Sequence, residues 1–340
     1  MSSQGLRRYA AALLVSACLG CGGSTSGSAE SPVDGADPGA DPNSTAKHAL
    51  YAIPGTATRM RLPDGFTRPA RDARLAHEEL GIVASLVELR VAADEVQETM
   101  RGVRAGLTEK IEVDSESPVE RASGAIGFTV RGRREGLSAS AAALSAGETV
   151  SILLVIHSPE SADVVAGIVG SVDIAPEATF DPLLAHGLSF GEMAGLELVS
   201  KTLAPIMFFE KGVKAPVPPD AAVLSIAIVP VPEMDHPNER MAGAALGGLL
   251  RAYGPDPDHV EAATLRVDGT EVSEVVTQGS DKGSPVALYG AALIEPHAVL
   301  AFFGKVGAKR RDQYVPRFRK LVESMHRSAP PLEVAQPAGG

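Results

Sequence analysis

The order of apolar and polar residues predicts two halves built from the same succession of elements. In the first half, residues 80–89 predict a strand, residues 93–107 an amphipathic helix, and residues 123–130, 137–144 and 149–156 three further strands. The last of these is TVSILLVI, an unbroken apolar run that is typical of a buried strand. A helix follows, and its apolar stripe is formed by Val164, Val165, Ile168, Val169 and Val172.

The second half repeats this order. Strands are expected at residues 202–209, 222–231, 262–267, 272–277, 285–294 and 297–303, and an amphipathic helix at residues 239–253. The closing helix is expected near Val315-Pro316, with an apolar stripe at Tyr314, Phe318, Leu321, Val322 and Met325. Pro316, like Pro159 in the first half, is then placed near the first helical turn, where a missing N–H costs no hydrogen bond.

This succession predicts an α+β fold with two tandem related α/β/α sandwich domains, each built on an antiparallel sheet and preceded by a disordered N-terminal tether. We expect the first domain at residues 48–175 and the second at residues 176–327, with the junction within residues 174–182. A repeat of about 120–150 residues agrees with the usual size of a domain.

The N-terminus has the pattern of a bacterial lipoprotein signal peptide. Arg7 and Arg8 precede an apolar run over residues 9–17, which ends in a small residue directly before Cys18. We therefore expect a signal peptide at residues 1–17 and lipidation of Cys18. Cys21 is the alternative acceptor, but it lacks the apolar residue three positions earlier that Val15 provides for Cys18.

Composition predicts the regions that flank the two domains. Residues 18–47 are rich in Gly, Ser, Pro and Asp and show no apolar periodicity, so we expect a disordered linker there. Residues 328–340 contain three prolines and are expected to form a disordered tail.

The formal net charge of −11 restricts the partners of this chain. It argues against a nucleic acid, because phosphates are bound by clustered Lys and Arg. It also argues against attraction to anionic lipid, so membrane attachment is expected through the acyl chains of the modified cysteine. Neither candidate cysteine is followed by Asp, which favours the outer membrane in a bacterium that has two membranes.

One motif predicts an enzymatic alternative. Gly187-Leu188-Ser189-Phe190-Gly191 fits the G-x-S-x-G pattern of serine hydrolases, and His297 with either Asp256 or Asp281 follows in a suitable chain order. However, the pattern is short, Gly and Ser are frequent in this chain, and residues 193–199 do not predict the helix that should follow the serine. An envelope serine hydrolase is therefore the alternative interpretation.

No metal or cofactor site is predicted. His77-Glu78 begins an H-E-x-x-H pattern, but Gly81 occupies the position of the second histidine. Asp256-Pro257-Asp258-His259 is typical of a turn that ends a helix. The chain contains no glycine-rich nucleotide-binding motif.

Basic residues gather near the C-terminal end of this acidic chain. Such a cluster is often explained by solubility and by the helix dipole, but it can also bind an anionic partner. The candidate binding residues are Lys309, Arg310, Arg311 and Arg317.

Residues 222–327 resemble the PsbP/Mog-like superfamily, which includes bacterial envelope lipoproteins. The resemblance depends on a hairpin, an apolar strand that ends in Phe303-Gly304-Lys305, and a final helix with Tyr314-Val315-Pro316 and Phe318. The first half departs from this pattern, because Ile156-His157-Ser158 replaces the aromatic-Gly ending. The resemblance implies a binding or assembly role without shared active-site residues. We therefore expect a non-catalytic envelope lipoprotein whose partner is an envelope protein or a small ligand.

Overall fold

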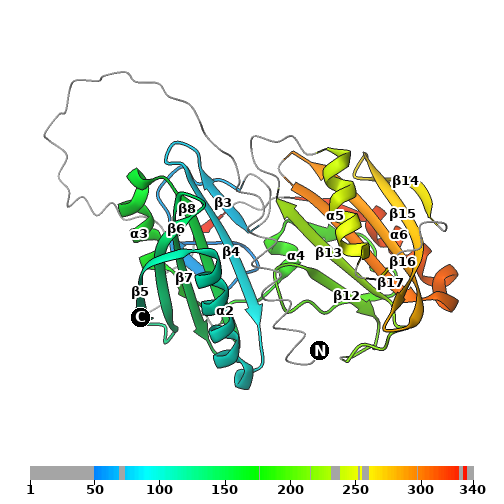
Figure 1. Ribbon diagram of the computed structural model, residues 1–340, viewed down its shortest axis with the longest axis horizontal. Helices are drawn as coiled ribbons and strands as arrows, with labels where there is room; N and C mark the ends of the chain where they lie inside the picture. Colours follow the sequence, from blue (N-terminus) through cyan, green and yellow to red (C-terminus); the bar gives the residue numbers. More distant parts are fainter. Residues whose placement is uncertain are drawn as a thin grey trace, which may run out of the picture.

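A computed structural model describes residues 50–68, 73–175, 177–214, 216–230, 238–251, 253–254, 260–296, 298–328 and 332–334. Two antiparallel sheets with helices packed on them lie side by side (Figure 1). The predicted α+β class with antiparallel sheets is confirmed.

The first half of the chain forms a six-stranded sheet in the order β3-β4-β8-β7-β6-β5. Its strands are β3 (Arg74–His77), β4 (Ile82–Arg90), β5 (Glu112–Glu120), β6 (Ile126–Arg134), β7 (Leu137–Ala146) and β8 (Thr149–His157). Helix α2 (Val96–Lys110) packs on one face through Val103 and Leu107. Helix α3 (Ala162–Ser171) packs on the other face through Val165 and Ile168. We call these elements the first module.

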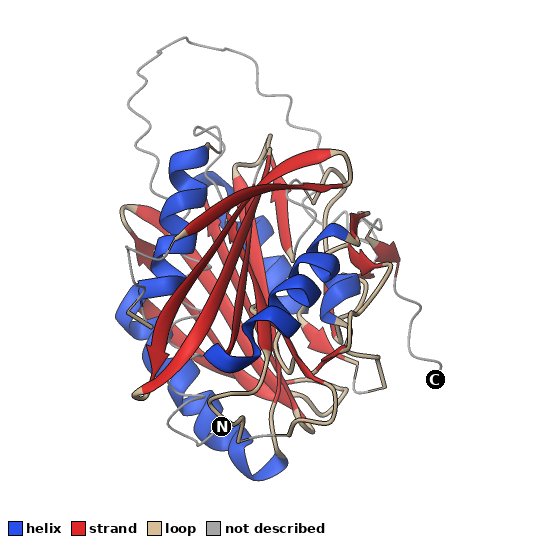
Figure 2. Ribbon diagram, turned by 90° about the vertical axis from the view of Figure 1, so that its right-hand side faces the viewer, coloured by secondary structure: helices blue, strands red, loops and turns tan. Residues whose placement is uncertain are grey.

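The second half forms a seven-stranded sheet in the order β11-β12-β13-β17-β16-β15-β14. Its strands are β11 (Leu196–Leu198), β12 (Ile206–Glu210), β13 (Val223–Pro230), β14 (Glu261–Val267), β15 (Thr270–Asp281), β16 (Ser284–Glu295) and β17 (Ala298–Gly307). Helix α5 (Glu239–Arg251) covers one face with Leu246 and Leu250. Helix α6 (Arg311–Glu323) covers the other, and Figure 2 shows helices on both sides of the fanned strands. We call these elements the second module.

The two modules share one strand order. Without the short β11, the second sheet runs β12-β13-β17-β16-β15-β14, which corresponds strand for strand to β3-β4-β8-β7-β6-β5. The first helix follows the second strand and the second helix follows the last strand in both modules. The duplication expected from the apolar pattern is therefore present in the topology.

A small third sheet lies outside this repeat. It has the order β19-β1-β2-β9 and consists of β1 (Leu50–Ala52), β2 (Thr58–Arg61), β9 (Asp173–Ile174) and β19 (Glu333–Val334). Met60 of β2 packs in the core that α3 also covers. Because β19 pairs with Tyr51 and Ala52, the expectation of a disordered tail over residues 328–340 is wrong for Glu333–Val334.

The chain between the modules is bound to the first sheet. The Arg90 N–H donates to the Lys201 carbonyl at 2.7 Å, and the Leu203 N–H donates to the Glu88 carbonyl at 3.1 Å. Residues 201–203 therefore pair with the C-terminal end of β4 in an antiparallel manner. The His186 Nε2 lies 2.7 Å from the Leu203 carbonyl oxygen. Helix α4 (Pro182–Ala185) and the two-stranded sheet of β10 (Leu188–Phe190) and β18 (Met325–Arg327) occupy the remainder of this region.

The final helix begins earlier than the apolar stripe predicted. A 3-10 turn at Ala308–Arg310 leads directly into α6, so Pro316 lies inside the helix rather than in its first turn. Five apolar side chains of α6 are buried against the sheet, and each contributes about 1.5–3 kcal/mol relative to exposure. This packing outweighs the hydrogen bond that proline removes.

Within the described residues, no helix is long and apolar enough to span a membrane. The candidate lipidation residues Cys18 and Cys21 lie outside these residues, as does the proposed linker.

Candidate functional site at the start of α6

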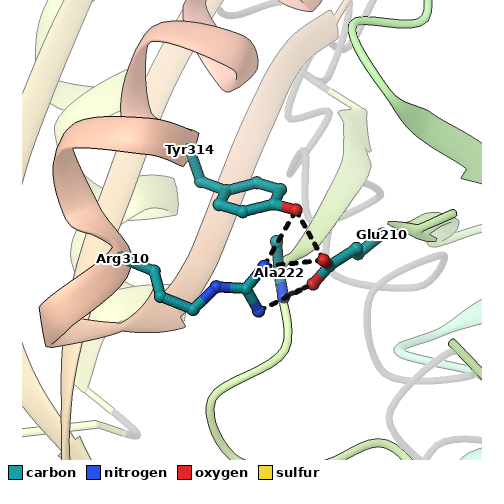
Figure 3. A network of polar contacts seen from close by, with 4 residues as sticks. All are labelled: Glu210, Ala222, Arg310 and Tyr314. Carbon is teal, nitrogen blue, oxygen red and sulfur yellow. Dashed lines mark hydrogen bonds and ion pairs between the residues drawn. The ribbon is translucent and has the colours of Figure 1, made fainter.

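The basic segment predicted from the sequence as a binding site contributes Arg310 to a network of polar contacts (Figure 3). Arg310 ends the turn that follows β17, and Glu210 ends β12, so the fold brings together residues that lie far apart in the chain. Arg310 donates from Nη1 and Nη2 to the two Glu210 carboxylate oxygens, at 2.9 and 2.6 Å. The Tyr314 hydroxyl donates to Glu210 Oε1 at 2.6 Å, and the Ala222 N–H approaches Oε2 at 3.5 Å.

These contacts stabilise the charged form of the carboxylate. The Arg310 hydrogen bonds lower the pKa of Glu210 from 4.5 to about 2, with a further contribution from the Tyr314 hydroxyl, while partial burial opposes the shift. The same hydrogen bonds raise the pKa of Arg310. The network therefore fixes α6 to the end of β12, and Arg310 is already engaged by a carboxylate.

Tyr314 also contacts a second guanidinium group, that of Arg317, through its ring. Its ring is contacted by Arg310, 4.6 Å from the ring centroid, and by Arg317, 4.8 Å from it. Arg317 additionally lies over Gly195, which has φ +79°. A Cβ at Gly195 would stand 3.1 Å from Arg317 Nη1, so glycine leaves space for the guanidinium there.

The other two residues of the predicted basic site differ from each other. Arg311 forms an ion pair with the exposed Glu261 of β14. Lys309 is exposed and forms no ion pair with the residues that the structure describes. Nearby, Arg319 binds Glu274 in a bidentate pair and Lys320 pairs with Glu192 at 2.7 Å, so carboxylates from distant segments neutralise most of this basic segment.

The hydrolase motif is placed differently from a nucleophile elbow. Ser189 lies in the middle of β10 and is exposed, whereas an elbow would lie between a strand and a following helix. Its cross-strand partner is His326, whose Nδ1 is 3.6 Å from Asp268 Oδ1. Of the residues proposed to act with Ser189, Asp281 pairs with Lys305, and His297 and Asp256 lie outside the described residues.

The buried carboxylate of Glu88 was not predicted from the sequence. The Ala57 N–H donates to both of its oxygens at 3.1 and 2.9 Å, and Thr58 donates to it from its backbone N–H and its hydroxyl. Burial raises the pKa of Glu88, although these hydrogen bonds partly oppose the shift. The sequence gives one indication of this buried carboxylate: Glu88 is the single acidic residue in the apolar strand pattern of residues 80–89.

The described histidines of the first module bind backbone carbonyl groups. His77 Nε2 lies 2.9 Å from the Asp64 carbonyl oxygen, and His157 Nδ1 lies 2.7 Å from that of Ser158. Among the described residues, no group of three or more His, Cys, Asp and Glu side chains is arranged to hold a metal ion.

The fold and this site define a two-module α+β protein of the α/β/α sandwich type, with a partly neutralised basic surface on the second module. Neither a protein-family model nor a curated protein sequence matches the chain.

Solved structures similar to this chain include three from different bacteria. LpqN, involved in cell envelope biogenesis of Mycobacterium tuberculosis, is 10% identical with a TM-score of 0.30, over 41% of this chain and 81% of that one. Cyanobacterial PsbP from Synechocystis sp. PCC 6803 is 14% identical with a TM-score of 0.29, over 42% and 87%. The immunity protein TplEi of the T6SS from Pseudomonas aeruginosa is 11% identical with a TM-score of 0.32, over 82% and 97%.

Proposed function

We propose that this chain is a non-catalytic binding or assembly protein of the bacterial cell envelope, held at the membrane by a lipidated Cys18 or Cys21. The two modules form the recognising part of the molecule. The partner class is an envelope protein or a small ligand, and neither a cofactor nor a nucleic acid takes part.

This proposal is supported by the structural role of the ionisable groups in the interior, which bind other elements of the fold. Glu88 holds the backbone at Ala57 and Thr58, and Glu274 holds Arg319 of α6. Glu295 holds Arg327, whose side chain is 3% exposed. These groups fix one element to another through those contacts. Chemistry of this kind supports a rigid body that acts through its surface.

Recovery of the full chain from solubilised envelopes tests the proposal. We expect mass spectrometry to find an acylated Cys18, with Cys21 modified instead if it is the acceptor, and a partner that co-purifies in a fixed ratio. A Cys18→Ser, Cys21→Ser double variant should lose the acyl group and membrane attachment but keep its partner in solution. An unmodified thiol at both cysteines would refute the anchor, and the absence of any stoichiometric partner would refute the binding role.

A serine hydrolase is the second candidate function. It is favoured because Ser189 lies opposite His326 in the two-stranded sheet, and His326 in turn lies near Asp268. Ser189 makes no hydrogen bond to the imidazole within the described contacts, and His326 and Asp268 are 62% and 55% exposed. A fluorophosphonate probe distinguishes the candidates. Labelling that is lost in Ser189→Ala would support the hydrolase, whereas an unlabelled native chain supports the binding protein.

A further inference from the structure

Arg317 differs from its neighbours in having no carboxylate partner. Arg310, Arg311 and Arg319 each pair with an acidic side chain of another element. In the part of the chain that the structure describes, Arg317 forms no ion pair, and its interaction is with the face of Tyr314. Its N–H donors are therefore available to a ligand, while the three other guanidinium groups are occupied.

The guanidinium of Arg317 is held in place before any ligand binds. Tyr314 is 2% exposed, and the Glu210 carboxylate fixes its hydroxyl. Gly195 lies beside the guanidinium on a second side, where an added Cβ would stand 3.1 Å from Arg317 Nη1. A side chain that is already ordered loses less conformational entropy on binding than a mobile surface arginine does.

The backbone of a second basic residue, Lys211, lies beside Gly195. The Lys211 N–H donates to the Gly195 carbonyl at 3.2 Å. The Lys211 side chain is exposed and forms no ion pair with the described residues. Arg310 neutralises Glu210, whereas Glu197 keeps its charge and accepts through Oε1 from the Gly212 N–H at 3.1 Å. Arg317 and Lys211 therefore outnumber the one remaining carboxylate among these residues, on a chain whose net charge is −11.

We propose that Arg317, with Lys211 beside it, binds a carboxylate in an acidic segment of a partner protein. This site rests on the proposed binding function and names one surface through which it operates. A planar guanidinium matches a carboxylate in a two-point contact, as Arg310 already does with Glu210. A lipid surface fits less well, because electrostatic attachment contributes about 1 kcal/mol for each basic residue and needs several of them.

Binding of fluorescein-labelled tetraglutamate to the full chain, followed by fluorescence anisotropy at constant ionic strength, tests this site. We expect saturable binding that weakens about tenfold in Arg317→Gln, because a hydrogen bond to a charged group is lost. Gly195→Ala should weaken binding as well, since its Cβ displaces the guanidinium. Arg101→Gln removes an exposed arginine of α2 that contacts no aromatic ring of the described residues, and it should bind as the native chain does.

Equal binding by the native chain, Arg317→Gln and Arg101→Gln would overturn the proposal, because binding would then not depend on Arg317. Arg317-dependent sedimentation with phosphatidylglycerol vesicles, in the absence of peptide binding, would assign the site to lipid instead and also overturn it. A partner captured equally by the native chain and by Arg317→Gln would refute this site and leave the proposed binding function intact.

Discussion

Replacement of Glu210 by Gln should destabilise the second module in a pH-dependent way. The pKa of this carboxyl falls from 4.5 in the unfolded chain to about 2 in the folded protein. One pKa unit corresponds to about 1.36 kcal/mol, so the shift sets an upper limit of about 3 kcal/mol on its contribution at pH 7. The side chain is 20% exposed and glutamine retains one acceptor oxygen, so we expect a loss of about 2 kcal/mol.

The sign of the pH dependence follows from the direction of the shift. A carboxyl with a lowered pKa stabilises the fold above its unfolded pKa, and this contribution disappears as the pH falls through the folded value. The free energies of unfolding of the native chain and Glu210→Gln should therefore differ most above about pH 4.5 and converge towards pH 2.

Urea unfolding followed by circular dichroism at pH 7, 4 and 2.5 measures this difference, and hydrogen exchange in β12 and α6 assigns it to the second module. Glu192→Gln is the matched control, because Glu192 pairs with Lys320 while both side chains are largely exposed, and it should cost less than about 1 kcal/mol. A loss for Glu210→Gln that is equal at all three pH values would refute the electrostatic reasoning.

Four further variants test other contacts. Glu88→Ala should cost about 3 kcal/mol in urea unfolding, because it leaves the donors of Ala57 and Thr58 unsatisfied, whereas Glu88→Gln should cost less; equal costs would contradict this. Because burial raises the pKa of Glu88, the contribution of this carboxyl to the free energy of unfolding should decrease as the pH rises from 4.5. This pH dependence is opposite in sign to that of Glu210. Tyr289→Phe should stabilise the chain by about 1 kcal/mol, because the buried hydroxyl is near the Glu274 carboxylate but lacks a well-aligned acceptor among the described residues. Burial, and then the charge of Glu274, raises the pKa of Tyr289. A lower midpoint of thermal unfolding would refute this expectation. A chain ending at Ser328 lacks β19 and should show faster hydrogen exchange at Tyr51 and Ala52 with little change in the second module; unchanged exchange would exclude a role for that pairing.

Local patterning was sufficient where one element buries a regular set of apolar positions. The unbroken apolar runs at β8 and β17 predicted buried strands. The stripes of α3 and α6 predicted helices, because a period of 3.6 residues follows from helical backbone geometry. Strand β5 was missed because all but one of its residues are exposed and its sequence EVDSESPVE has no apolar alternation. Its pairing with β6 is decided by the sheet rather than by its own composition.

The candidate site shows the same division. The sequence by itself located the basic segment at Lys309, Arg310, Arg311 and Arg317, because charge is a property of each residue. Only the tertiary structure decided that Glu210 neutralises Arg310 and that Tyr314 and Gly195 hold Arg317 without a carboxylate. Glu210 is 100 residues from Arg310 in the chain, and Gly195 is still farther from Arg317, whereas Tyr314 lies on the same helix as Arg317. Nothing in local periodicity specifies which acid meets which base. The repeat of elements was thus encoded locally, whereas the availability of each cation depends on long-range packing.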